Sequence, residues 1–266
     1  MKTNNKSFKG IEAAGLIIIA CFIVAICIYH YVFGNPVNFM NNDPANHPLP
    51  GNMLGTIYKG GIIVPVIQTL LLTVLTLSVE RFFTIRAAFG RGKLSKFVAQ
   101  IKDALNKGDL DEAQRLCDKQ RGSVANVVGS TLRKYHEMEN TADLTKEQKI
   151  LAIQKELEEA TALELPMMQQ NLPIIATITT LGTLMGLLGT VLGMIRSFAA
   201  LSAGGGTDSV ALSTGISEAL INTAFGILTG ALAVISYNYY TNKIDNLTYS
   251  LDEVGFSIVQ TFAATH

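Results

Sequence analysis

The chain has 266 residues, of which 48% are hydrophobic and only 16% carry a charge. Its 21 lysine and arginine residues are balanced by 21 aspartate and glutamate residues, which excludes the basic excess of a nucleic-acid-binding protein. The three cysteines form neither a Cys-x-x-Cys motif nor a Cys/His spacing, so we expect no disulfide, no metal site and no cofactor. The hydrophobic residues gather in long blocks, which is typical of a protein with several membrane spans.

The first 60 residues predict a membrane helix followed by a loop. Residues 1–10 are polar and carry three lysines. Residues 11–33 form an apolar run that is too long for the hydrophobic part of a signal peptide, so we expect an uncleaved helix. Residues 34–60 are rich in Asn and Pro, which excludes a long helix, although a short one is expected near Met53 to Tyr58.

A second span, residues 61–80, leads into a hydrophilic region, residues 81–171. Apolar periodicity and capping residues predict a helical domain in this region. The expected helix signals are Gly108 as a C-cap, Asp109 and Ser123 as N-caps, and a capping box formed by Thr145 and Gln148. We expect the last of these helices to continue into the next span, with a kink at Pro166 or Pro173.

Two further apolar segments, residues 172–200 and 210–241, are joined by a short Gly-rich turn at 201–209. Each is long enough to cross a bilayer, which takes about 20 residues, so they predict an antiparallel membrane hairpin. Residues 242–266 form a tail whose apolar residues have helical spacing. The sequence therefore predicts an all-α, polytopic membrane protein with four transmembrane helices and a cytoplasmic helical domain.

Small residues in this hairpin recur at steps of three and four. Because glycine is a poor helix former, so many glycines need a packing reason, and a stripe of small residues allows two membrane helices to approach closely. The glycines that we assign to this packing are Gly182, Gly186, Gly189, Gly193, Gly226 and Gly230. Plain helix packing explains them, but it does not explain Thr190, Thr223 and Glu218, which put polar groups at membrane depth and suggest a functional site.

The distribution of basic residues predicts the orientation of the chain. Lysines precede the first span and four basic residues follow the second, whereas the segments 34–60 and 201–209 hold almost none. By the positive-inside rule, both chain ends and residues 81–171 are cytoplasmic. Arg196 and Glu218 have similar predicted depths, so they are a candidate charge pair; alternatively, Glu218 faces a water-filled path and Arg196 extends outward.

Two motifs in the hairpin point to a family. Gly186-Leu-Leu-Gly-Thr190-Val-Leu-Gly193, followed by Glu218-Ala-Leu-Ile-Asn-Thr223-Ala-Phe-Gly226, resembles the ExbB/TolQ proton-channel family, to which MotA is more distantly related. The resemblance covers about residues 61–245 and its motifs look closest to ExbB. The helix at 11–33 departs from the three-span pattern of ExbB, and the four spans of MotA keep a MotA-like stator subunit open as an alternative.

The resemblance implies a function and partners. ExbB-like proteins form a pentameric ring in the bacterial inner membrane around two helices of a dimeric, single-span ExbD-like partner, whose aspartate carries the proton. Thr190 and Thr223 match threonines that line the proton path, and Glu218 matches a glutamate of the same region. Proton flow would energise a TonB-like protein for outer-membrane transport, or the Tol-Pal system if the chain is TolQ-like.

Two other classes of function are alternatives to this one. An intramembrane enzyme would need a nucleophile and a base at membrane depth, and the hairpin holds neither a Ser/His nor an Asp/Asp pair, so we expect no enzyme. A purely structural scaffold would assemble in the same way without conducting protons, and it would tolerate loss of Thr223 or Glu218.

Overall fold

The computed structural model describes residues 6–203 and 209–265, and its long elements are all helices. The chain divides into two compact units: residues 1–79 with 171–238 form the first, and residues 80–170 with 239–266 form the second. Residues 204–208 of the predicted turn, and residues 1–5 with Lys2, lie outside the described residues.

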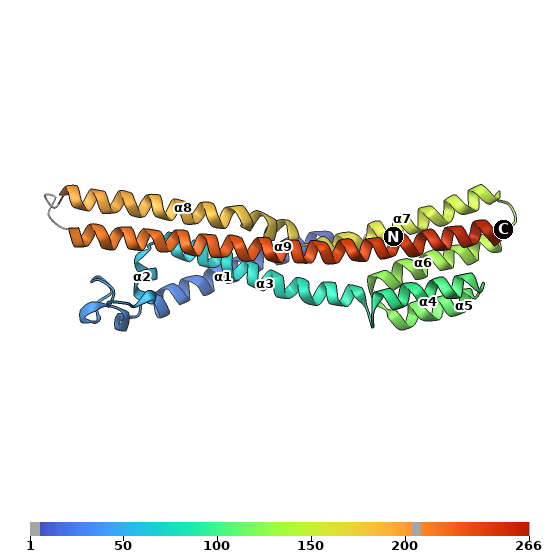
Figure 1. Ribbon diagram of the computed structural model, residues 1–266, viewed down its shortest axis with the longest axis horizontal. Coiled ribbons are helices and arrows are strands. Elements are labelled where there is room, and N and C mark those ends of the chain that lie inside the picture. The colour runs from blue at the N-terminus through green and yellow to red at the C-terminus, as the bar shows by residue number, and fades with distance from the viewer. Residues whose placement is uncertain (1–5, 204–208, 266) are drawn as a thin grey trace. The chain divides into compact units, whose positions relative to one another are not determined.

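The first unit holds the apolar helices. It contains α1 (Lys6–Ile28), α2 (Met53–Lys59), the start of α3 (Ile63–Phe89), α8 (Leu172–Ala203) and the start of α9 (Ser209–Thr265) (Figure 1). Four segments of the described residues are long and apolar enough to span a membrane, and each overlaps one of the four predicted spans. The predicted all-α, polytopic membrane protein is thereby confirmed.

The segment between α1 and α3 is ordered by its asparagines and aromatic residues. It includes a π-helical turn, Tyr29–Phe33, and two 3-10 turns, Pro36–Asn38 and Met40–Asn42. Tyr29 stacks on Tyr58 with ring centroids 4.6 Å apart, and its hydroxyl donates a hydrogen bond to the Tyr58 carbonyl oxygen over 2.9 Å. The Asn52 side chain caps α2, which confirms the short helix predicted near Met53.

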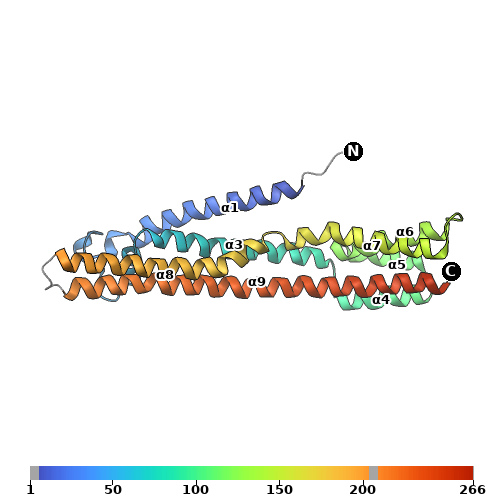
Figure 2. The same cartoon turned by 90° about the horizontal axis from the view of Figure 1, so that it is seen from above.

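The second unit is a helical domain. It contains the end of α3, the C-terminal part of α9, and four complete helices: α4 (Leu94–Asn106), α5 (Leu110–Gln120), α6 (Gly122–Glu139) and α7 (Lys146–Gln169) (Figure 2). The apolar residues of the predicted tail, Ile244 to Ile258, lie on one buried face of α9, so their helical spacing is confirmed. Tyr135 packs edge-on against Phe262 with ring centroids 4.9 Å apart.

Local capping signals predicted the helix ends of this unit well. Gly108 has a left-handed φ of 69° after α4, as a C-cap requires. The Asp109 carboxylate accepts a hydrogen bond from the Glu112 amide over 2.9 Å, and Thr145 with Gln148 forms the predicted capping box of α7. These signals work because each one involves residues within three or four positions along the chain.

Two local predictions were wrong. Ser123 is not the N-cap of α6, because this helix begins one residue earlier, at Gly122, after Arg121 in a left-handed conformation. The helix before the hairpin does not run on into the membrane span: α7 ends at Gln169, Asn171 has a φ of 66°, and α8 begins at Leu172. Pro173 explains the break, because it cannot donate the backbone hydrogen bond that would continue α7, and asparagine tolerates the left-handed conformation.

Candidate functional site

The candidate site lies where α8 and α9 run side by side in the first unit (Figure 1). The glycines let the two backbones touch: a Cβ added to Gly226 would lie 2.6 Å from the Gly186 Cα atom and 2.7 Å from the Gly182 carbonyl oxygen. A Cβ on Gly230 would lie 2.8 Å from the Thr179 carbonyl oxygen. The crossing therefore leaves no space for side chains at these positions.

The part of the crossing nearer the end of α8 packs glycines against short side chains. A Cβ on Gly189 would lie 2.5 Å from the Asn222 Cβ atom, and one on Gly193 would lie 2.6 Å from the Ala219 Cβ atom. All six glycines that the sequence assigned to helix packing thus line the same α8–α9 contact. Close approach of this kind strengthens dispersion contacts between membrane helices and brings polar side chains within hydrogen-bonding distance.

Thr190 and Thr223 meet at this contact, and their hydroxyl groups form a hydrogen bond with each other. Each hydroxyl also lies 3.3 Å from the Gly186 carbonyl oxygen, and Thr190 lies 3.3 Å from the Ala219 carbonyl oxygen as well. Since each hydroxyl has one proton and two lone pairs, the pair can exchange donor and acceptor roles without carrying a charge. This is the chemistry that a proton path lined by water and hydroxyl groups needs.

Glu218 and Arg196 lie in the same unit but form no ion pair within the described residues. The exposed Arg196 reaches the turn before α3, where its Nη1 atom lies 2.8 Å from the position of a Cβ on Gly61. Glu218 is half-buried, and the cation that acts on it electrostatically is Lys59. The predicted charge pair is therefore absent from this structure, because matching depth does not put two side chains on facing sides of their helices.

Asn222 is a residue of this site that sequence reasoning did not single out as functional. Its side chain is 1% exposed, and its Nδ2 group donates a hydrogen bond to the Gly60 carbonyl oxygen over 3.0 Å. The bond joins α9, one residue before Thr223, to the turn that begins α3. An amide inside an apolar span was the signal that could have identified it, because such groups are costly unless they are hydrogen-bonded.

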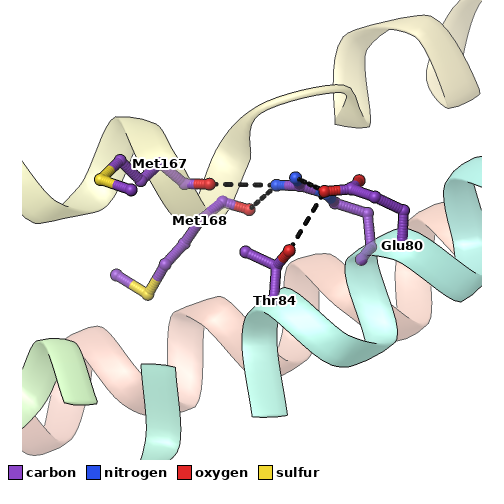
Figure 3. Close-up of polar contacts among 5 residues, drawn as sticks. Glu80, Thr84, Met167 and Met168 are labelled. Carbon is purple, nitrogen blue, oxygen red and sulfur yellow. Dashed lines mark hydrogen bonds and ion pairs between the residues drawn. The ribbon is translucent and has the colours of Figure 1, made fainter. Parts of the chain in front are cut away.

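A second polar cluster, around Arg81, lies in the second unit (Figure 3). The Arg81 side chain is 2% exposed and donates hydrogen bonds to the carbonyl oxygens of Met167 and Met168 over 3.0 and 3.2 Å. It also forms an ion pair with Glu80, which accepts a further hydrogen bond from the Thr84 hydroxyl over 3.1 Å. Arg81 thus satisfies the last carbonyl groups of α7, just before the break that precedes α8.

The described residues contain no cluster of three His, Cys, Asp or Glu side chains that could hold a metal ion. The three cysteines are free thiols. Cys117 is buried in the second unit, and burial raises the pKa of its thiol to about 12, so the thiolate is scarce at neutral pH.

Residues 123–253 match the model of the MotA/TolQ/ExbB proton channel family. An ExbB-like biopolymer transport protein of Synechocystis sp. is 40% identical over 86 residues, which is 32% of this chain and 41% of the relative. A second ExbB-like protein of that organism is 30% identical over 197 residues, covering 70% of this chain and 69% of the relative. The Tol-Pal system protein TolQ of Pseudomonas aeruginosa is 25% identical over 194 residues, covering 68% and 81%.

The first of these matches spans less than half of the relative's own length, whereas the second and third each span more than two thirds. The family match includes all of α8, most of α9 and therefore both threonines of the hydroxyl pair. From its sequence, its four apolar helices and these relatives, the chain belongs to the MotA/TolQ/ExbB proton channel family.

Proposed function

We propose that this chain is the ring-forming subunit of a motor driven by the proton-motive force in the bacterial inner membrane. In this proposal it acts as ExbB does, with an ExbD-like partner, to energise TonB-dependent transport across the outer membrane. The observation that carries the proposal is the hydrogen bond between the Thr190 and Thr223 hydroxyl groups at a glycine-lined helix crossing. The half-buried Glu218 lies on the same helix as Thr223 and adds the carboxyl group of the path.

The scarcity of ionisable groups supports a partner inside the ring. Residues 172–200 carry one charged side chain, Arg196, and residues 210–241 carry one, Glu218. One carboxyl group cannot form a complete proton relay across a bilayer, so we propose that a second carboxylate comes from two helices of an ExbD-like dimer. One elementary charge crossing 100 mV releases about 2.3 kcal/mol, which is enough to bias a conformational step.

Self-association follows from the same argument, because a partner can be enclosed only by several copies of the chain. We propose a pentamer, as in ExbB-like proteins. The orientation that we propose has both chain ends and the helical domain in the cytoplasm, since basic residues flank the spans on that side.

Two alternatives within the family each have an observation in their favour. A TolQ-like role in the Tol-Pal system is supported by the TolQ relatives that match this chain. A MotA-like stator role is supported by the four candidate spans. Co-purification of the chain with the products of neighbouring genes distinguishes them: a single-span partner with a membrane aspartate favours ExbB or TolQ, and a partner with a peptidoglycan-binding domain favours a stator.

Proton conduction is tested by substitution in the full complex, reconstituted in liposomes with its partner. We expect Thr223→Val and Glu218→Ala to abolish proton uptake driven by a membrane potential, because they remove a hydroxyl and a carboxyl group from the path. Thr223→Ser keeps the hydroxyl and should retain most of the uptake. The matched control is Thr177→Val, since Thr177 is exposed on α8 and donates a hydrogen bond to the Pro173 carbonyl oxygen of its own helix.

Membrane abundance and ring size are measured in parallel, so that a failure to assemble is not mistaken for a failure to conduct. Wild-type proton uptake by Thr223→Val and Glu218→Ala in fully assembled rings would overturn the proposal and favour a structural scaffold. Uptake that is lost equally in the Thr177→Val control would show that the assay responds to general damage to α8 rather than to the hydroxyl pair.

A further inference from the structure

A hollow of about 420 Å³ lies beside the start of α4 in the second unit. Its lining contains four cationic side chains, Arg91, Lys93, Lys96 and Lys119, together with the amides of Gln100 and Gln120. Among the described residues that line it, none is acidic. A hollow whose charged groups all have the same sign attracts an ion of the opposite sign.

Arg91, Lys93 and Lys96 are neighbours in the sequence, whereas Lys119 reaches this hollow through the fold. The Arg91 amide donates a hydrogen bond to the Gln120 carbonyl oxygen over 2.6 Å, and the Gln120 side chain donates one to the Phe89 carbonyl oxygen over 2.8 Å. Gly90 permits this approach, because its φ is 72° and a Cβ there would lie 2.5 Å from the Gln120 carbonyl oxygen. Lys119 at the end of α5 is thereby held beside Arg91, so positive-inside topology alone does not explain the cluster.

The four cationic side chains of the hollow form no ion pair among the described residues, unlike several other lysines of the same unit. Lys102, Lys107 and Lys134 each form an ion pair with a carboxylate, at 2.5 to 3.0 Å. The ion pairs of the described residues use none of the hollow's four cations, and all four side chains are exposed. The hollow therefore carries an uncompensated charge of four.

The start of α4 adds to the attraction for an anion. Its N-cap residue is Lys93, which makes no side-chain capping bond, whereas Asp109 caps α5 and Thr145 caps α7. A helix start favours negative charge through its free amide groups and its dipole. Here that effect and the four cations act on the same hollow.

The distance along the chain from the apolar part of α3 indicates which anion is available. The predicted span ends at residue 80, and Phe89, the last residue of α3, lies about 14 Å further along the helix at 1.5 Å per residue. The polar headgroup layer extends roughly 5–8 Å beyond the hydrocarbon, and charges act over about 8 Å at physiological ionic strength. Cations that begin two residues after Phe89 are thus within reach of phospholipid phosphates.

We propose that the hollow lined by Arg91, Lys93, Lys96 and Lys119 binds the phosphate-containing headgroup of an anionic phospholipid. The site holds the start of the helical domain at the membrane surface. This inference goes beyond the proposed motor function and requires only that α3 spans the bilayer, so it can fail while proton conduction stands.

The test uses the full-length protein in uncharged detergent, with short-chain phosphatidylglycerol, phosphatidylcholine and inorganic phosphate as separate probes. Bound molecules are counted by native mass spectrometry during a titration. The variant K93Q/K96Q/K119Q removes three charges from the hollow. The matched control K107Q/K134Q/K155Q removes three charges from lysines of the same unit that are paired elsewhere.

We expect wild-type protein to prefer phosphatidylglycerol to phosphatidylcholine, and the hollow variant to lose at least about tenfold in affinity, since each lysine near a lipid surface contributes roughly fivefold. The control should lose less than about twofold. Single K119Q should lose about fivefold, and it keeps the test valid if the triple variant does not fold.

Three results would overturn the proposal. An equal loss in the hollow variant and the control would indicate diffuse attraction by net charge. The absence of any preference for phosphatidylglycerol over phosphatidylcholine would exclude an anionic-lipid site. Binding of inorganic phosphate as tight as that of phosphatidylglycerol would assign the hollow to a soluble phosphate instead.

Discussion

Asn222 joins three parts of the first unit through one buried side chain. Its amide group donates to the Gly60 carbonyl oxygen over 3.0 Å, and its Cβ atom fills the space above Gly189. Its neighbour in the sequence, Thr223, belongs to the hydroxyl pair. A hydrogen bond between membrane helices contributes on average about 0.6 kcal/mol, and up to roughly 1.7 kcal/mol when it is buried.

We therefore expect Asn222→Ala to reduce the free energy of unfolding by about 0.5–1 kcal/mol: it removes a hydrogen bond and leaves the Gly60 carbonyl group unpaired, but it also removes the buried Oδ1 atom, which accepts no hydrogen bond from the described residues. Unfolding of the purified protein in mixed micelles with increasing denaturing detergent measures the change. Asn238→Ala, at an exposed position of the same helix, is the control and should have little effect. Equal stability of the two variants would show that the bond to Gly60 contributes nothing.

Cys117 illustrates how burial sets reactivity. Its thiol pKa rises from 9.0 to about 12, chiefly because burial disfavours the charged thiolate. Each pKa unit lowers the thiolate fraction tenfold below the pKa, so at pH 8 this fraction is about a thousandfold lower than for a free thiol.

In a variant that keeps only Cys117, with Cys21 and Cys27 replaced by alanine, we expect maleimide labelling of the folded protein to be very slow at pH 8. The rate should rise about tenfold per pH unit within the range in which maleimide is stable, since the thiolate is the reactive form. Mass spectrometry of the labelled protein measures the rate, and the same variant after denaturation is the reference. Rapid labelling in the folded state would contradict the burial of Cys117.

Helix pairing in the hairpin depends on the absence of side chains at a few positions. A Cβ on Gly226 would lie 2.6 Å from the Gly186 Cα atom, which real contacts essentially never allow. The Gly186 Cα atom and the nearby Gly182 carbonyl oxygen belong to the backbone of α8, so neither can move aside as a flexible side chain would. α8 and α9 would therefore have to separate.

We expect Gly226→Ala to destabilise the protein by about 1–3 kcal/mol, the usual range for overpacking, and to reduce ring assembly. The matched control is Gly15→Ala in α1, because a Cβ on Gly15 would meet nothing within 4 Å. That substitution should be neutral or stabilising, since alanine is the better helix former. Thermal unfolding followed by circular dichroism separates the two outcomes.

Arg81 connects two helices that lie far apart in the sequence. Its guanidinium group satisfies carbonyl oxygens at the end of α7, 86 and 87 positions away, and pairs with Glu80 (Figure 3). We expect Arg81→Leu to lower the free energy of unfolding by about 2 kcal/mol, since it leaves the carbonyl oxygens of Met167 and Met168 without their hydrogen-bond donor. Arg86→Leu, at an exposed position of the same helix, should change it by less than about 0.5 kcal/mol.

These elements also explain what the sequence could predict. Helix ends set by neighbouring residues, such as those at Asp109 and Thr145, were predicted because capping is local. The resemblance implied only that Thr190 and Thr223 line one path, and the hydrogen bond between their hydroxyl groups was not predicted. The Arg196–Glu218 ion pair, one of the two alternatives that matching depth allowed, does not form in this structure. Depth in the membrane can be counted along a helix, but the direction in which each side chain points depends on how the two helices pack.

Burial of a charged residue was beyond sequence reasoning as well. Arg81 ends an apolar run, and such a residue normally lies in water or among headgroups. Its burial follows from carbonyl groups freed where α7 stops, and that break was itself mispredicted as a continuous helix with a kink. Because a continuous helix was expected there, the contact between Arg81 and the end of α7 could not be predicted.

At the scale of the whole molecule, the distribution of basic residues predicts which side of the membrane each segment faces. The proposed orientation puts the loop at 34–60 in the periplasm and the tail at 242–266 in the cytoplasm, because basic residues flank the cytoplasmic ends of the spans.

We expect a cysteine introduced at His47 to react with a membrane-impermeant maleimide in intact spheroplasts, and one introduced at Asn246 to react only after permeabilisation. Both positions are exposed in the structure, so access through the protein is equal and the membrane decides the result. A background with the three native cysteines replaced by alanine serves as the control. The reverse labelling pattern would invert the orientation and assign the helical domain to the periplasm.

The hydrogen bonds from Arg81 to the end of α7 affect which substitutions are tolerated there. Arg81 binds main-chain oxygens, which every amino acid possesses. The interaction therefore constrains the side chain at position 81 far more than the side chain at position 167. Met167 is 54% exposed and offers only its backbone, so a saturation library should accept nearly any residue there except proline. The same library should reject almost every replacement at position 81. Substitutions at this contact should therefore be tolerated at Met167 and not at Arg81.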